Sequence, residues 1–211
     1  MKKQTGFTLV EIAIVMVIIG LLLGGVLKGQ EIITNAKIKN LENDFNGITA
    51  AIYSYQDRYR ALPGDDLRAT SRFKGTVPVG DGNGNIAGRF DSAQDSDESR
   101  RFWAHLRFAG LVAGEPVTPY DQPLNAFNGR TGVSSDKPSG GGGGGGGGST
   151  PPPNMSGVYV GFSNIPLDVA VILESRSDDY NSQDGNIQAD QGKAGKYTDL
   201  TDGEINLYFA L

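Results

Sequence analysis

Residues 7–27 form an apolar run that contains a single acid, Glu11, and this run limits what the chain can become. As a helix rising about 1.5 Å per residue, it would extend about 32 Å, close to the thickness of a bilayer's hydrocarbon core. Lys2 and Lys3 precede the run, Lys28 follows it, and the very short leader favours a cytoplasmic amino terminus. The run therefore predicts a membrane-spanning helix.

Glu11 is the residue that any interpretation of this helix, as a secretory signal or as a membrane anchor, has to explain. A secretory signal places small residues after a shorter apolar region, whereas here the small residue Gly6 stands before it. A plain single-span anchor fits the hydropathy but does not account for Glu11, which in lipid would cost about 2.5 to 3.5 kcal/mol on insertion scales. An acid at this position suggests a partner of opposite charge.

The hexapeptide Gly6-Phe7-Thr8-Leu9-Val10-Glu11, after a short basic leader and before an apolar run, resembles the processing signature of type IV pilins and of type II secretion pseudopilins. The resemblance implies that residues 1–6 are a leader, that the bond between Gly6 and Phe7 is cleaved, and that Phe7 becomes N-methylated. It also implies that Glu11 and the Phe7 amine of a neighbouring subunit meet during assembly. Burying the two charges as a pair is far less costly than burying either one alone.

The resemblance also implies partners and a location. The partners are a prepilin peptidase that is also an N-methyltransferase, an inner-membrane assembly platform, the membrane before assembly, and other copies of the chain in a homopolymeric helical filament. The precursor would be a single-pass inner-membrane protein, and the product an extracellular surface filament or a periplasmic pseudopilus. The main hypothesis is a pilin. A pseudopilin and a singly anchored membrane protein that acts through its head remain alternatives.

The pilin resemblance implies an α+β fold in which one long helix packs on a small antiparallel sheet. Residues 7–29 would form its transmembrane or filament-core half, and residues 30–60 its amphipathic half. The amphipathic half has apolar positions spaced three and four apart, which is a helical stripe. Its members are Ile38, Leu41, Phe45, Ile48, Ile52, Tyr55 and Tyr59. This spacing also allows a coiled coil, but we expect the stripe to cover the chain's own head.

The apolar half of this helix contains four glycines, of which Gly20, Gly24 and Gly25 lie within the apolar run. Each weakens an isolated helix by about 1 kcal/mol relative to alanine. Small residues also allow close helix packing in lipid, so the glycines have a structural interpretation. In pilin filaments a comparable region can lose helical structure, and the resemblance therefore marks these glycines as candidate flexibility sites.

Residues 61–211 are expected to form an α+β head that begins where Leu62-Pro63-Gly64 ends the helix. An acidic start and an apolar periodicity predict a helix over residues 95–112. Runs rich in β-branched and aromatic residues predict strands over 158–162 and 205–209, and a second short helix is predicted over 166–175.

Composition argues against catalysis and against nucleic-acid binding. The chain has no cysteine and one histidine, His105, so thiolate chemistry and most histidine-based chemistry are unavailable. His105 is interpreted as a packed helix residue. The net charge of −5 offers no broad basic face for phosphates. We therefore expect a protein that is not an enzyme, needs no cofactor and does not bind nucleic acid.

Two stretches are rich in oxygen ligands. The stretch at residues 80–88 partly matches a calcium loop, but Val79 and Phe90 stand where carboxylates are expected, which favours a glycine-rich turn. The other stretch is similar in position and composition to the carboxy-terminal calcium loop of major pseudopilins. Its candidate calcium ligands are Asp178, Asp179, Asp184 and Asn186, and a solvated acidic turn is the alternative.

Residues 138–153 are rich in glycine and proline and include an unbroken glycine run, Gly140 to Gly148. Such a sequence cannot bury side chains, so we expect a surface loop or a segment between subunits. Ser149 and Thr150 stand before three prolines and are candidate glycosylation sites.

Overall fold

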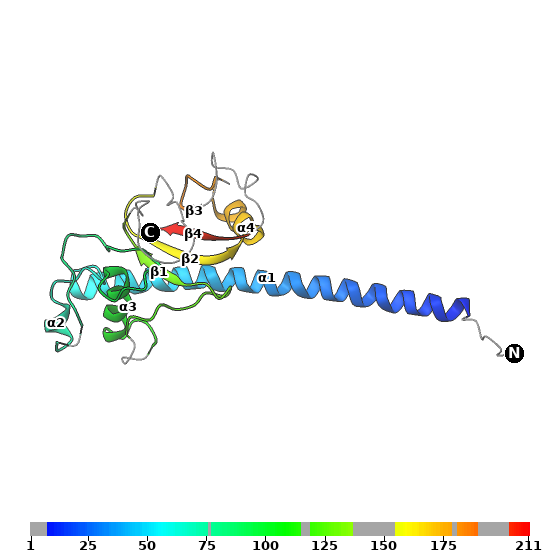
Figure 1. Ribbon diagram of the computed structural model, residues 1–211, viewed down its shortest axis with the longest axis horizontal. Helices are drawn as coiled ribbons and strands as arrows, with labels where there is room; N and C mark the ends of the chain where they lie inside the picture. Colours follow the sequence, from blue (N-terminus) through cyan, green and yellow to red (C-terminus); the bar gives the residue numbers. More distant parts are fainter. Residues whose placement is uncertain (1–7, 76, 115–118, 137–154, 179–180, 190–202) are drawn as a thin grey trace. The chain divides into compact units, whose positions relative to one another are not determined.

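The computed structural model describes residues 8–75, 77–114, 119–136, 155–178, 181–189 and 203–211. The chain divides into two compact units, Met1–Lys39 and Asn40–Leu211. Figure 1 shows the order of the elements along the chain.

The helix α1 spans Leu9–Tyr59, which is 51 residues. Within the second unit, its buried side chains include Leu41, Ile48, Ile52 and Tyr55, at the spacing expected of a helical stripe. The predicted stripe therefore covers the chain's own head and not a coiled-coil partner.

The end of α1 is made by a change of backbone conformation. Arg60 has a φ of 54°, in the left-handed region, and its N–H donates to the carbonyl of Gln56 at 2.8 Å. Gly64, with a φ of 93°, then reverses the chain. A Cβ at Gly64 would lie 2.7 Å from the carbonyl oxygen of Glu98, so only glycine fits this turn.

Two helices lie beside the carboxy-terminal end of α1 (Figure 1): α2, Ala69–Arg72, and α3, Glu98–Phe108. The helix α3 is shorter at both ends than the predicted 95–112. Asp97 is extended at its start, and Gly110 has a φ of 68° just after its end.

Four strands form one antiparallel sheet in the order β1-β2-β4-β3. Their bounds are β1 Thr131–Ser134, β2 Tyr159–Pro166, β3 Ile187–Ala189 and β4 Glu204–Ala210. The helix α4, Leu167–Ser177, directly follows β2. The predicted fold class, a long helix with a small antiparallel sheet, is confirmed.

The predicted strands are the two central ones, β2 and β4, which pair with Phe162 opposite Leu207. The two edge strands, β1 and β3, were not predicted. They are four and three residues long, too short for alternation to stand out from chance.

Aromatic side chains connect α1 to the sheet within the second unit. The ring centroids of Phe45 and Phe209 are 5.2 Å apart, and Phe209 meets Phe162 edge to face at 5.4 Å. On the other side of β4, Tyr208 contacts Phe90 and Tyr159, again edge to face. Because successive side chains of a strand point to opposite faces of the sheet, β4 contributes to an aromatic cluster on each face.

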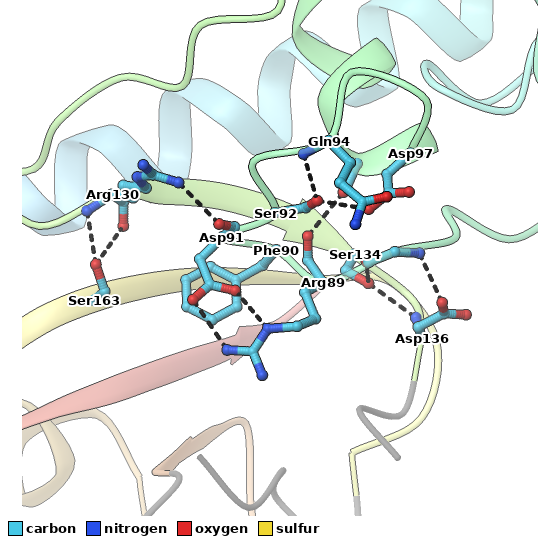
Figure 2. Close-up of polar contacts among 12 residues, drawn as sticks. Arg89, Phe90, Asp91, Ser92, Gln94, Asp97, Arg130, Ser134, Asp136 and Ser163 are labelled. Atoms are coloured by element: carbon cyan, nitrogen blue, oxygen red, sulfur yellow. Dashed lines mark hydrogen bonds and ion pairs between the residues drawn. The ribbon is translucent and has the colours of Figure 1, made fainter. Parts of the chain in front are cut away.

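Figure 2 shows how the segment before α3 is attached to the sheet. The Arg130 guanidinium, next to β1, donates to the backbone carbonyl of Asp91 at 3.0 Å. The Asp91 carboxylate in turn accepts two hydrogen bonds from Arg89, at 2.9 and 3.0 Å. Ser134 of β1 donates to the carbonyl of Gly88 at 2.7 Å. These contacts hold a segment without regular secondary structure against the first strand.

Candidate assembly site

The first turn of α1 is closed by a reciprocal pair, Thr8 and Glu11. The Thr8 N–H and hydroxyl donate to Glu11 Oε2 at 2.8 and 2.7 Å, and the Glu11 N–H points back to the Thr8 hydroxyl at 3.3 Å. This is a capping box, with Thr8 at the N-cap and Glu11 three residues later. The sequence interpretation named Glu11 but missed Thr8, although the Thr-x-x-Glu spacing carries the signal.

The side chains that follow are exposed in the isolated chain. From Leu9 to Leu27, the exposed large hydrophobic residues range from 46% exposure at Ile19 to 86% at Leu9. This part of α1 is long and apolar enough to cross a membrane, with a mean hydropathy of 2.7 and none of the most apolar window buried. Because exposing such a surface to water is unfavourable, it requires lipid or other protein chains around it.

The candidate flexibility sites Gly20, Gly24 and Gly25 all lie within α1, which is helical through each of them. A Cβ at any of the three would meet nothing within 4 Å. Packing within this chain therefore does not require glycine at these positions. Their role in flexibility stays a prediction.

The cleavage and methylation residues Gly6 and Phe7 lie outside the described residues, which begin at Thr8. The bond predicted to be cut thus lies just before the capping box. Cleavage there would leave a new amine one residue ahead of Thr8.

A model of the prokaryotic N-terminal methylation motif matches residues 1–27. The chain carries this prepilin motif. The motif is a class III signal, typical of type IV pilins and pseudopilins, and implies processing by a prepilin peptidase. Together with the apolar helix, it indicates a membrane-anchored precursor. A search of curated proteins and a search of solved structures each found no match to the chain.

The motif bears on function at a coarse level. The chain is prepilin-like in its first 27 residues, and proteins that carry this motif are generally structural subunits and not enzymes. The motif does not distinguish a pilin from a pseudopilin, because both groups carry it.

The head of this prepilin-like chain contains a cluster that the sequence did not predict. The buried Asp65 carboxylate accepts the backbone N–H groups of Asn83, at 3.0 Å, and Gly84, at 2.8 Å, and that of Gly82 as well. The buried Glu98 carboxylate accepts from Asp81 and Ala87, each at 2.9 Å. Two acids that are distant in sequence thus hold the loop at residues 80–88.

Residues 80–88 form a turn with Gly82, Gly84 and Gly88 at positive φ, and Asp65 and Glu98 fix it. Ligand atoms of Asp65, Asp81 and Glu98 lie within 4.8 Å of one another. Burial raises the pKa of Asp65 and of Glu98. The carboxylate oxygens of Asp65 and Glu98 are nevertheless taken by backbone donors, so the cluster has a structural use already.

The candidate calcium ligands are only partly placed. Asp178 follows α4, and its Oδ2 accepts the N–H of Ile187 at 2.6 Å. A Cβ at Gly185 would lie 2.3 Å from the same oxygen, so the Asp178 carboxylate rests on the loop that leads into β3.

The backbones of the other described candidates also belong to this turn. The Asp184 N–H donates to the Asn181 carbonyl at 3.2 Å, and the Asn186 carbonyl accepts from Ala210 at 2.8 Å. Asp179 lies outside the described residues. Calcium at this turn stays a prediction.

His105 is packed, as predicted. Its Nδ1 accepts the N–H of Gly64 at 2.9 Å, and its Nε2 lies 3.0 Å from the carbonyl of Pro78. Its ring is fully buried and stacks on Tyr55 at 6.2 Å. Burial lowers the pKa of His105, so the neutral ring connects two turns of the head.

The candidate glycosylation residues Ser149 and Thr150 lie outside the described residues, as does most of the glycine- and proline-rich stretch at 138–153. Their modification stays a prediction.

Proposed function

We propose that this chain is a pilin: a structural subunit that is cut between Gly6 and Phe7, methylated at Phe7, and polymerised through α1 into a helical surface filament. The observation that carries the proposal is the placement of Glu11. It is an acid at the start of a helix whose large apolar side chains are exposed in the isolated chain.

Glu11 contributes differently before and after assembly. In the isolated chain both hydrogen bonds that its side chain accepts from Thr8 use one carboxylate oxygen, Oε2. In a filament, the methylated amine of Phe7 from a neighbouring copy supplies a positive charge for the same carboxylate. A charge pair in apolar surroundings is retained because neither member is stable there alone.

The apolar side chains explain why the pairing leads to a polymer. In the precursor they are covered by lipid, and in a filament the same surfaces are covered by the corresponding helices of other copies. The membrane-inserted precursor is therefore a store of subunits, which the peptidase and an inner-membrane platform convert into a filament.

The decisive experiment isolates sheared surface material from cells that express the chain with a pilus assembly system. We expect filaments by electron microscopy, and mass spectrometry should find a chain that begins with N-methylated Phe7. A full-length chain that stays monomeric in the membrane with its Gly6–Phe7 bond intact would overturn the proposal. A processed chain found only in short periplasmic filaments would assign it to the pseudopilins.

A further inference from the structure

The carboxy-terminal end of α1 carries three exposed basic side chains, Arg60, Arg68 and Lys74, which together are called the basic patch. Arg60 directly follows α1, and the other two flank α2. The Arg72 guanidinium donates to the Tyr59 carbonyl at 3.0 Å and so holds α2 beside the last turn of α1. The basic patch therefore belongs to one end of the head.

The rest of the head does little to neutralise this patch. The side chains of Arg68 and Lys74 have no ion pair or hydrogen bond with any described residue. Arg60 and Asp57 are 3.7 Å apart and are 83% and 85% exposed, and an ion pair of this kind is weak. By contrast, other exposed arginines of the head each bind an acceptor; they include Arg58, Arg89 and Arg130. Positive charge thus remains available at the end of α1.

An acidic patch, made of Asp168 and Glu204, lies at the start of α4. Asp168 is in the first turn of α4, and Glu204 begins β4 opposite Pro166 of β2. The Leu167 N–H donates to the Gly203 carbonyl at 3.3 Å, which brings the two acids to the same corner of the head. Both side chains are exposed, and neither has a hydrogen bond or an ion pair within the part of the chain that the structure describes.

The two patches lie at opposite ends of the head. The strand β4 runs toward the end of α1, because Phe209 meets Phe45, whereas Leu211, two residues later, lines a pocket with Gln56. Glu204 begins this strand, which extends about 20 Å at the usual rise per residue. Figure 1 agrees, with α2 beside the end of α1 and α4 at the other end of the sheet. Exposed charges separated by more than about 8 Å are largely screened at physiological salt, so the patches do not neutralise each other within one copy.

We propose that the basic patch of one copy binds the acidic patch of a second copy in the assembled filament. The inference rests on the proposed function, since it is the filament that brings heads together. The occupant is another copy of the chain because every copy carries both complementary charges, each without a strong partner of its own. Complementary charges across an interface fix its register and suppress wrong arrangements.

The position of the patches also suits a polymer. A contact between two different surfaces of the same protein is head-to-tail, and it continues from copy to copy as an open helical filament unless the rotation closes a ring. A basic patch at one end and an acidic patch at the other form such a pair. The apolar part of α1 would supply most of the burial, and the patches would set how one head follows the next.

The first test reverses the charge of each patch separately. Arg68→Glu with Lys74→Glu places acids against the acidic patch, and Asp168→Lys with Glu204→Lys places bases against the basic patch. Each double variant should lower the yield of sheared filaments by about tenfold or more, because like charges that face each other across an interface are strongly unfavourable. Leader cleavage and the melting temperature of the detergent-dispersed chain should stay unchanged, since all four side chains are exposed.

The matched control is Asp95→Lys with Asp121→Lys, which makes the same change in net charge outside both patches. Asp95 is 60% exposed and has an ion pair with Arg100, and Asp121 is also exposed. The filament yield of this control should stay within about twofold of the wild type. A control that loses as much yield as the patch variants would overturn the inference. A loss from the basic-patch variant alone would also overturn it, because the basic patch would then bind an anion other than this chain.

The second test combines the two patch reversals in one chain. Opposite charges then face each other again, so the filament yield should recover to within about threefold of the wild type. Independent folding defects at two distant patches would add and not cancel. Adding the control pair to the basic-patch variant restores the net charge equally but should not restore the yield.

A combined variant that assembles no better than the separate reversals would overturn the inference and leave the pilin proposal intact. Equal recovery from the acidic-patch pair and from the control pair would overturn it as well, because net charge alone would then explain the result. A wild-type chain that forms no filaments would overturn both the inference and the pilin proposal.

Discussion

The two halves of α1 are one continuous helix but have different surroundings. From Leu9 to Leu27, the large apolar side chains are exposed, whereas from Leu41 to Tyr55 the helix buries a regular stripe in the head. The first half is helical through its apolar composition and its Thr8–Glu11 cap, and the second through tertiary packing. In an isolated chain, therefore, only the second half has its apolar stripe covered, and the first half still needs lipid or other chains around it.

The same contrast applies to the acids of the two regions. Glu11 is exposed, and its carboxylate accepts hydrogen bonds from Thr8, three positions away. Asp65 and Glu98 are buried and hold backbone that is distant in sequence. We therefore expect Glu11 to affect assembly and the head acids to affect folding.

The largest expected effect is on assembly. Glu11→Ala should reduce the filament yield at least tenfold, because the amine of Phe7 would have to be buried without its carboxylate partner. The melting temperature of the head should not change. The matched control is Glu31→Ala, which removes an exposed carboxylate of the same helix that pairs with Lys28 at 2.8 Å and should have little effect. If Glu11→Ala gave the wild-type yield of filaments in sheared material, the role of Glu11 in assembly would be contradicted.

The next effect is on the head alone. Glu98→Ala leaves the N–H groups of Asp81 and Ala87 without their acceptor, which should cost about 3 kcal/mol. For a chain of this size, calorimetry should find the melting temperature lower by roughly 6 to 12 °C. Asp95→Ala, which breaks an ion pair with Arg100 at 2.9 Å on a 60% exposed carboxylate, should cost about 1 kcal/mol or less. Equal losses from the two variants would contradict the role assigned to Glu98.

A smaller effect concerns pH. Burial lowers the pKa of His105 in the folded head, so as pH falls below about 6.5 the unfolded chain binds a proton that the folded chain resists. Stability should therefore decrease with acidification, from about 6.5 down to the lowered pKa of the folded state.

The raised pKa values of Asp65 and Glu98 act in the opposite direction, adding stability as pH falls below their folded pKa values. The histidine contribution is isolated by subtracting the pH profile of His105→Gln from that of the wild type. Parallel melting-temperature profiles for the two proteins between pH 5 and 7, near the reference pKa, would contradict the assignment.

The last comparison concerns two glycines of the head, for which the expected changes in stability have opposite signs. Gly47→Ala should stabilise the head by up to about 1 kcal/mol, because the position is helical and open. Gly64→Ala should destabilise it, since its φ is 93° and a Cβ would lie 2.7 Å from the Glu98 carbonyl oxygen. Chemical denaturation measures both. If both substitutions changed the stability in the same direction, the difference assigned to Gly47 and Gly64 would be wrong.

Much of the fold was predictable because its signals are local. The stripe from Ile38 to Tyr59, the apolar run and the two central strands are each encoded within one stretch of sequence. The edge strands β1 and β3 were missed because their position depends on the neighbours with which they pair.

By itself, the sequence determined the prepilin motif and the apolar helix, since Gly6, Glu11 and the apolar run are read in order along the chain. Only the tertiary structure decided that Asp65 and Glu98 hold the turn at residues 80–88 and that His105 connects two turns. The physical reason is distance along the chain. A hydrogen bond or a groove between segments far apart in sequence leaves no periodic trace in either segment, and it exists only once the whole head has packed.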